Sequence, residues 1–258
     1  MKSVLGGVIV SAMIASSTPA FGGDYNWTGF YLGANAGVGI NASSYKLTPA
    51  GAFLTDGFPA TNPQRTDSAD LDGPAFTGGV QGGYNWQVER FVVGLETDFN
   101  YNGVDQTDIV NRPLARPVVG NFVHNVSQKL DWFGTMRGRA GVTPLPEWLL
   151  YVTGGLAYGH VSSETRVLFS VGDDLYAGSR STTRVGWTIG AGSEVAIASA
   201  WSIKLEYLYV DLGTFSYNNA CVNCAALGFD PLAYKTDIST REHIVRIGVN
   251  YRFGGGRP

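Results

Sequence analysis

Apolar and polar residues alternate with a period of two along most of this chain, most clearly in the stretch 241–253. One face of that stretch carries Val245, Ile247, Val249, Tyr251 and Phe253. The other face carries Ile244, Arg246, Gly248, Asn250 and Arg252. Because successive side chains of a β-strand point to opposite faces of a sheet, this pattern predicts a strand with one apolar and one mostly polar face.

The same alternation recurs in eight stretches, which we expect to be the strands of one sheet. They cover residues 27–40, 74–87, 91–101, 122–143, 148–167, 182–197, 201–209 and 241–253. In the fourth stretch, the alternation places Leu130 and Trp132 on the apolar face and Asp131 on the polar face.

The connections between these stretches alternate in length. We predict long loops at 41–72, 103–120, 169–181 and 211–238, and short connections at 88–90, 144–147 and 198–200. This regular asymmetry is typical of an all-β, up-and-down antiparallel sheet with about eight strands. Closing such a sheet into a barrel removes its edges.

Alternation alone leaves open whether the apolar face points inward, as in a soluble lipocalin-like barrel, or outward toward lipid. The polar faces contain many Gly, Asn, Thr and Tyr residues but few Lys or Glu, unlike a water-exposed surface. Aromatic residues gather near the short connections, as in the interfacial girdle of a membrane barrel. They are Trp86, Phe91, Trp148, Trp201, Tyr251 and Phe253. These features favour a closed transmembrane β-barrel, which pairs its backbone groups internally where hydrocarbon offers no partners.

Composition supports this interpretation. Only 15% of the 258 residues are charged, whereas soluble proteins contain roughly 25%. The net charge of −3 provides no basic field, so we expect no nucleic-acid partner. The body of the chain contains no apolar run of about 18 residues, which argues against a helical membrane span.

The N-terminus has the pattern of a secretory signal peptide. Lys2 supplies the positive end, an apolar run follows from Val4 to Ala15, and Thr18-Pro19-Ala20 offers a small-residue cleavage site. We therefore predict a signal peptide at 1–20 and an outer-membrane β-barrel domain at 21–258. A buried N-terminal helix is the alternative.

Five motifs carry a family resemblance. They are Trp27-Thr28-Gly29-Phe30-Tyr31-Leu32-Gly33-Ala34-Asn35-Ala36-Gly37, Gly78-Gly79-Val80-Gln81-Gly82-Gly83-Tyr84-Asn85-Trp86, Gly94-Leu95-Glu96-Thr97-Asp98, Trp132-Phe133-Gly134-Thr135-Met136-Arg137-Gly138-Arg139 and Val249-Asn250-Tyr251-Arg252-Phe253. With them the chain resembles the OmpA-like eight-stranded outer-membrane barrels, in particular the outer-membrane immunogenic protein or porin family group of alphaproteobacteria. The resemblance covers essentially all of the expected mature chain.

The resemblance implies an integral protein of the outer membrane of a Gram-negative bacterium, with a structural role in the envelope and at most a narrow pore. Its partners would be outer-membrane lipid, the barrel-assembly machinery and an unknown loop ligand. Tyr251 and Phe253 would form the assembly signal, although members usually stop at the terminal Phe and residues 254–258 follow here. Family relatives include haemin-binding surface proteins, so the alternative function is surface binding of haem or of a host partner through the loops.

Charged residues on the predicted polar face form the strongest candidate site. Alternation places Glu96, Asp98, Arg137, Arg139, Glu194, Lys204, Glu206, Arg246 and Arg252 there. An eight-stranded barrel is just wide enough for side chains to fill its interior, and buried charges must be paired. We expect the first eight to form an ion-pair network that plugs the lumen. A gate, in which pairs exchange to open a small pore, is the alternative.

Other candidate chemistry is weaker. Cys221 and Cys224 have the spacing of a redox motif but lack its βαβ context, so we expect a loop disulfide in an oxidising compartment. The histidines His124, His160 and His243 are far apart in the sequence, and Asp70, Asp72, Asp173 and Asp174 fit solvated loops better than a Ca²⁺ site. No Gly-x-Ser-x-Gly occurs, and His160 has no evident nucleophile. We therefore expect no catalytic residues, no metal and no cofactor.

Overall fold

The computed structural model describes residues 25–51, 66–114, 120–169, 174–223 and 232–253. No helix in these ranges is long and apolar enough to cross a membrane. The elements, in chain order, are β1 (Gly29–Gly51), β2 (Asp67–Val88), β3 (Phe91–Pro113), β4 (Asn121–Leu145), β5 (Trp148–Phe169), β6 (Asp174–Ala196), β7 (Trp201–Cys221) and β8 (Leu232–Arg252). The predicted signal peptide at 1–20 lies outside the described residues.

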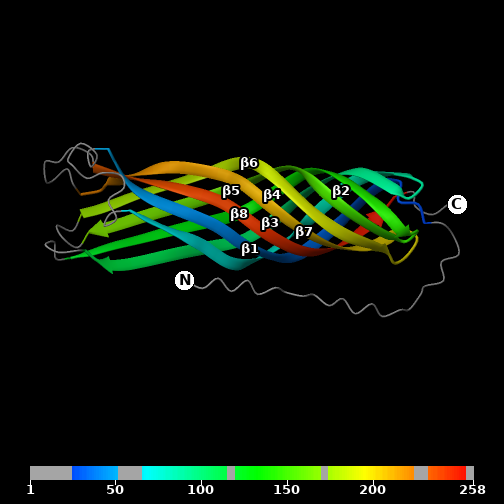
Figure 1. The fold of residues 1–258 in the computed structure, drawn as a ribbon, viewed down its shortest axis with the longest axis horizontal. Helices are drawn as coiled ribbons and strands as arrows, with labels where there is room; N and C mark the ends of the chain where they lie inside the picture. Colours follow the sequence, from blue (N-terminus) through cyan, green and yellow to red (C-terminus); the bar gives the residue numbers. More distant parts are fainter. Residues whose placement is uncertain (1–24, 52–65, 115–119, 170–173, 224–231, 254–258) are drawn as a thin grey trace.

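The strands form one closed antiparallel barrel (Figure 1). Each strand pairs with its neighbours in the sequence, and β8 pairs back to β1, where Gly33 lies opposite Asn250. The connections at 89–90, 146–147 and 197–200 are short and lie together at the right-hand end of Figure 1. The structure thus confirms the eight-stranded up-and-down barrel predicted from the sequence.

Apolar side chains cover the outside of the barrel near the short connections. Val80, Leu156 and Ile247 are more than half exposed, at 63%, 58% and 56%. Aromatic pairs border this belt on both sides: Trp201 and Tyr251 are 5.1 Å apart between ring centroids near the short connections, and Trp187 and Tyr209 are 5.3 Å apart at the far border. The apolar face therefore points outward, and the belt has the two aromatic girdles of a membrane barrel.

The border of the belt away from the short connections separates the barrel into two halves, which we name the membrane half and the distal half. The membrane half comprises 29–40, 76–88, 91–101, 132–145, 148–160, 185–196, 201–209 and 243–253. The distal half comprises 41–51, 67–75, 102–113, 121–131, 161–169, 174–184, 210–221 and 232–242. On β7 and β8 the membrane half is close to the roughly 9–11 residues that a tilted strand needs to cross a membrane.

The distal half corrects four of the sequence predictions. Most residues of four predicted long loops are in strands, namely those at 41–72, 103–120, 169–181 and 211–238. For example, β1 continues to Gly51, β3 to Pro113 and β7 to Cys221. The prediction was wrong because outward-facing Ser, Thr and Asp there resemble loop composition. Buried apolar residues such as Leu47 and Leu71 alternate with these polar residues only over short stretches, because polar residues also occupy some of the inward positions.

Two seams interrupt the sheet in the distal half. Residue pairing between β2 and β3 ends at Thr77 and Asn102. Pairing between β6 and β7 jumps from Ala177–Ala220 to Trp187–Asp211. Above the membrane the barrel is therefore split into two groups of four strands, β3–β6 and β7–β8–β1–β2, which the Tyr176–Cys221 and Ala177–Ala220 pairs join again near the distal end. They enclose an apolar core that extends into the membrane half at Phe133, Ala157, Leu208 and Ile244. The other members of this core are Tyr45, Leu71, Ala75, Val104, Val126, Leu130, Val161, Val210, Leu212, Phe215, Tyr217 and Ile238.

A β-bulge at the border of the two halves explains one further error. The pairing of β4 with β5 shifts between Leu130 and Trp132. The extra residue reverses which side chains point inward. Leu130 is therefore buried in the core at 2% exposure, while Asp131 is exposed, the opposite of the predicted faces.

Candidate functional site: a closed lumen

The eight charged residues predicted to form the network lie together in the lumen of the membrane half. Arg137 of β4 lies at the centre, where its guanidinium contacts Glu96, Asp98 (3.0 Å) and Glu206 (3.1 Å). Arg246 of β8 contacts Asp98 and Glu206 at 2.7 and 2.6 Å. Every side chain in these contacts is at most 2% exposed.

Two further cations complete the network. Lys204 Nζ lies 2.9 Å from Glu96 Oε1, and Arg139 Nη2 lies 2.7 Å from Glu194 Oε2. The network therefore joins four carboxylates to four cations, which leaves no net charge. Such balance is required because an unpaired charge in this interior would be costly.

Strand register brings these opposite charges together. Glu96 is the direct neighbour of Arg137 across β3 and β4, and Glu206 is the neighbour of Arg246 across β7 and β8. Both pairs lie on inward positions, so side-chain alternation and antiparallel register suffice to place them. The contacts that cross the lumen, such as Arg137 to Glu206, depend on the barrel being narrow.

Two tyrosines take part in the network and were missing from the predicted site. Tyr31 Oη donates a hydrogen bond to Glu96 Oε2 at 2.7 Å, and Tyr151 Oη donates to Glu206 Oε1 at 2.8 Å. The Arg139 guanidinium lies 4.1 Å from the centroid of the Tyr151 ring. Both tyrosines alternate onto the polar face in the sequence, and that position could have identified them.

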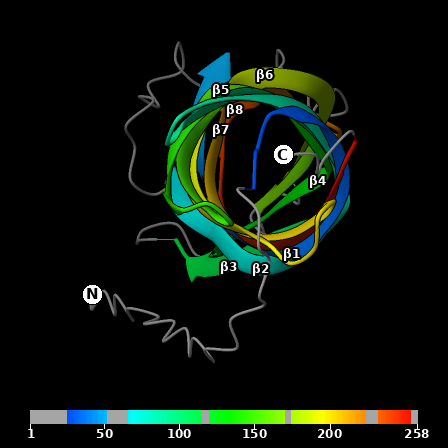
Figure 2. The ribbon, with the colours of Figure 1, turned by 90° about the vertical axis from the view of Figure 1, so that its right-hand side faces the viewer.

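A plug closes the lumen below the network, at the end with the short connections. Residues 25–28 precede β1, and in Figure 2 the dark blue start of the described chain crosses the barrel mouth. Trp27 is 2% exposed, and its indole Nε1 donates to the carbonyl of Pro146 at 2.9 Å. It packs with Val92, Leu149, Tyr151 and Ala196. The sequence alone gave no reason to place Trp27 inside the barrel.

The other predicted sites are dispersed. Cys221 is disulfide-bonded, and Cys224, its predicted partner, lies outside the described residues. Arg252 donates to the carbonyl of Ser199 at 3.1 Å and lies over the Tyr25 ring, apart from the network. Phe253 pairs its backbone N–H with the carbonyl of Phe30 at 2.8 Å, and its ring is 5.0 Å from that of Tyr251.

The histidines do not form a common site. His124 is buried in the distal core, where Nε2 lies 2.8 Å from Tyr45 Oη, and burial lowers the pKa of its imidazole. His243 lies on the outside beside Tyr207, and His160 lies there within 2.8 Å of Ser181 Oγ. Among the described residues, no three His, Cys, Asp or Glu side chains are placed to hold a metal ion. Asp70 and Asp72 lie on β2 and Asp174 is the first residue of β6, while Asp173 lies outside the described residues.

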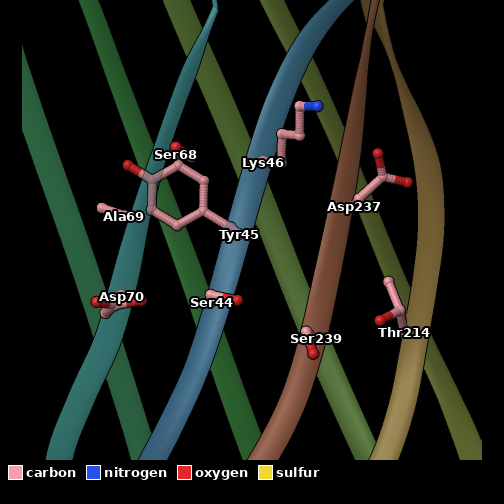
Figure 3. A pocket seen from close by; sticks show the side chains of 9 residues that line it. All are labelled: Ser44, Tyr45, Lys46, Ser68, Ala69, Asp70, Thr214, Asp237 and Ser239. Atoms are coloured by element: carbon pink, nitrogen blue, oxygen red, sulfur yellow. The ribbon is translucent and has the colours of Figure 1, made fainter.

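A polar groove of about 470 Å³ crosses the distal half over β2, β1, β8 and β7 (Figure 3). Its lining residues are Ser44, Tyr45, Lys46, Ser68, Ala69, Asp70, Thr214, Asp237 and Ser239. Lys46, Asp70 and Thr214 are exposed. The groove was not predicted, because it lies on strand segments whose composition predicted loops.

A closed barrel with an apolar outer belt, two aromatic girdles and a polar, charge-paired interior defines an integral outer-membrane β-barrel protein. The chain belongs to the family of the outer membrane protein beta-barrel domain, which matches residues 7–253. It is a protein of the outer membrane of Gram-negative bacteria, as the resemblance in the sequence implied.

The relatives support this placement. The 31 kDa outer-membrane immunogenic protein of Brucella melitensis is 38% identical over 89% of this chain and 85% of its own length. The 22 kDa outer membrane protein of Rhizobium leguminosarum bv. viciae is 31% identical over 75% of this chain and 68% of its own length.

Among solved structures, the outer membrane protein OprG from Pseudomonas aeruginosa matches with a TM-score of 0.50 and 10% identity, over 89% of this chain and 99% of that one. The outer membrane protease OmpT from Escherichia coli matches with a TM-score of 0.51 and 9% identity, over 86% and 97%. At these identities the likeness shows the shared barrel fold alone.

Proposed function

We propose that this barrel is a structural surface protein of the envelope, with a lumen that admits at most a narrow and occasional pore. The observation that carries the proposal is the neutral network of four carboxylates and four cations in the membrane half. The Trp27 plug lies below it and the apolar core of the distal half lies above it. A solute moving along the axis would have to displace all three layers.

Conductance of the refolded barrel in a planar bilayer tests this proposal. The wild-type barrel should show no sustained conductance. A variant carrying both Glu206→Ser and Arg246→Ser removes a facing pair, keeps the interior neutral, and should conduct more often. Steady conductance of the wild type, unchanged in the double variant, would show that solutes pass by another route.

We also propose that the protein has no enzymatic role. Ser181 and His160 are a nucleophile and a base in contact, as in a hydrolase site. The contact of His160 Nδ1 on its other side is the Thr183 hydroxyl, at 3.5 Å. A hydroxyl at this distance neither fixes the imidazole nor stabilises its cation as a carboxylate does. Incubation with phospholipid or a chromogenic ester should release no product above that from a His160→Gln variant.

The proposed partners are outer-membrane lipid and the barrel-assembly machinery, with Tyr251 and Phe253 as its recognition signal. Phe253 borders the belt beside Phe30, at 5.8 Å between ring centroids. Phe253→Ala should reduce membrane insertion in cells while leaving spontaneous refolding in detergent intact. Equal loss in both assays would mean that Phe253 serves folding alone.

Recognition of a polar ligand at the cell surface is the second candidate function, favoured by the groove across β2, β1, β8 and β7. Its volume falls within the roughly 300–1,000 Å³ of ligand sites, and its lining of hydroxyls, two carboxylates and one ammonium suits a hydroxyl-rich ligand. A panel of neutral oligosaccharides tests it, with Asp237→Asn expected to weaken any binding. A haemin titration tests the haem alternative, for which the groove offers no histidine.

A further inference from the structure

Two arginines lie at the seam between β6 and β7 without a carboxylate partner. Within the described chain, the ion pairs of the distal exterior are Lys129–Asp105, Arg166–Glu164, Lys235–Asp237 and Arg241–Asp211. Arg180 and Arg184 belong to none of them. Both lie in the part of β6 that has no ladder with β7.

The two guanidinium groups are held close to one another by β7. Arg180 Nη1 donates to the carbonyl of Ser216 at 2.9 Å, and Arg184 Nη2 donates to the carbonyl of Thr214 at 3.0 Å. Carbonyls two residues apart on one strand are separated by roughly 7 Å. Each guanidinium has five N–H donors and uses one of them on β7, so other donors remain available. The Nε of Arg184 is buried and is not among the donors that a ligand can reach.

The seam begins where the apolar belt ends. Val185 is 68% exposed on the outside of the belt, and Trp187 pairs with Tyr209 in the outer girdle. Arg184 therefore lies at the outer border of the hydrocarbon, and Arg180 lies further out by at most roughly 13 Å along the strand. The headgroup layer of a bilayer begins at this border and is roughly 5–8 Å thick on each side.

We propose that Arg180 and Arg184 bind a phosphate group of the phosphorylated glycolipid in the outer leaflet. Arginine binds phosphate with paired, charge-assisted hydrogen bonds, and two guanidinium groups anchored on carbonyls roughly 7 Å apart can contact one phosphate together. The β7 carbonyls orient the arginines before the lipid arrives. The proposal depends on the outer-membrane location and is independent of whether the lumen conducts.

Retention of lipid A by the refolded barrel tests the proposal. Wild-type protein is mixed with bis-phosphorylated lipid A, dephosphorylated lipid A or inorganic phosphate, and bound molecules are counted by native mass spectrometry as detergent is increased. Phosphorylated lipid A should be retained about tenfold better than the dephosphorylated form, a ratio that corresponds to one charge-assisted hydrogen bond. The double variant Arg180→Gln and Arg184→Gln should lose this preference.

Arg166→Gln is the matched control, because Arg166 is exposed on β5 and already paired with Glu164. The single variant Arg180→Gln alters only an exposed side chain and keeps the test valid if the double variant fails to fold. Equal retention of both lipids, or equal loss in Arg166→Gln, would overturn the proposal. Competition by millimolar inorganic phosphate would assign the site to a soluble phosphate and overturn the lipid assignment.

Discussion

The membrane half and the distal half of this barrel have opposite polarity on the same strands. On β8, Ile247 is 56% exposed to the outside of the membrane half, and its neighbour Arg246 is buried in the lumen at 1%. Further along the strand, Ile238 is fully buried in the core and Lys235 is exposed. The strand thus changes from apolar-outside to apolar-inside within a few residues.

The surrounding solvent accounts for this inversion. In hydrocarbon, apolar side chains are stable on the outside, and the narrow interior can hold polar groups that satisfy one another. In water, apolar burial drives folding, so the distal half has the core of a soluble β-sandwich. The seams fit this difference, because the closed ladder that hydrocarbon requires of the backbone is not required in water.

Breaking the network should have the largest effect. Arg137→Ala leaves Glu96, Asp98 and Glu206 without their shared cation, so the free energy of unfolding should fall by about 3–5 kcal/mol. Urea unfolding in lipid vesicles measures this. Arg166→Ala, whose partner Glu164 is exposed, should cost at most about 1 kcal/mol. Unchanged unfolding of Arg137→Ala would show that the ion pairs do not stabilise the barrel.

The exterior can be compared with a matched pair of substitutions on β7. Leu205→Arg introduces a charge near the middle of the belt and should cost about 2–4 kcal/mol. Asn218→Arg, at an exposed position of the distal half, should change stability by less than about 0.5 kcal/mol. Equal losses of stability in vesicle unfolding would mean that Leu205 does not face hydrocarbon.

The interior can be compared with a second pair, on β8. Ile238→Val removes a methyl group from the fully buried distal core and should cost about 1 kcal/mol. Ile247→Val removes the same group from a lipid-facing position, where lipid fills the space. The free energy of unfolding should therefore fall by clearly less than for Ile238→Val. Amide exchange should show the Ile238→Val effect confined to the distal strands, and a uniform effect would contradict two separately packed halves.

Mild acid should lower the stability of the distal half alone, and this is the smallest of the expected effects. Burial lowers the pKa of His124, so its neutral form is favoured by folding. The stability that this provides is present above the unfolded pKa of roughly 6.5 and is lost as the pH falls below it. The groups facing the imidazole are Tyr45, Asp67, Asp108 and Arg112.

Unfolding of the distal half, followed by amide exchange corrected for intrinsic rates, should accelerate between pH 7.5 and pH 5. A His124→Gln variant should lose this dependence. If wild type and variant respond alike, the acid sensitivity belongs to other groups.

The alternation in the sequence was enough to predict the membrane half. Side-chain direction along a strand is a local property, so Val245 to Phe253 and the inward charges could be placed by counting residues. The same counting failed at Leu130, because a single bulge reverses the faces and leaves no clear mark in the residues around it.

Other features depended on the closed sheet. The circumference of the barrel determines which inward groups meet across the lumen. The polar-face positions of Tyr31 and Tyr151 therefore could not show which carboxylates they contact, and the role of Trp27 as a plug became evident only in the tertiary structure. The distal strands, the two seams and the Arg180–Arg184 site likewise depend on register between strands. Register arises from pairing between distant segments, whereas the periodicity of one segment reports only its own two faces.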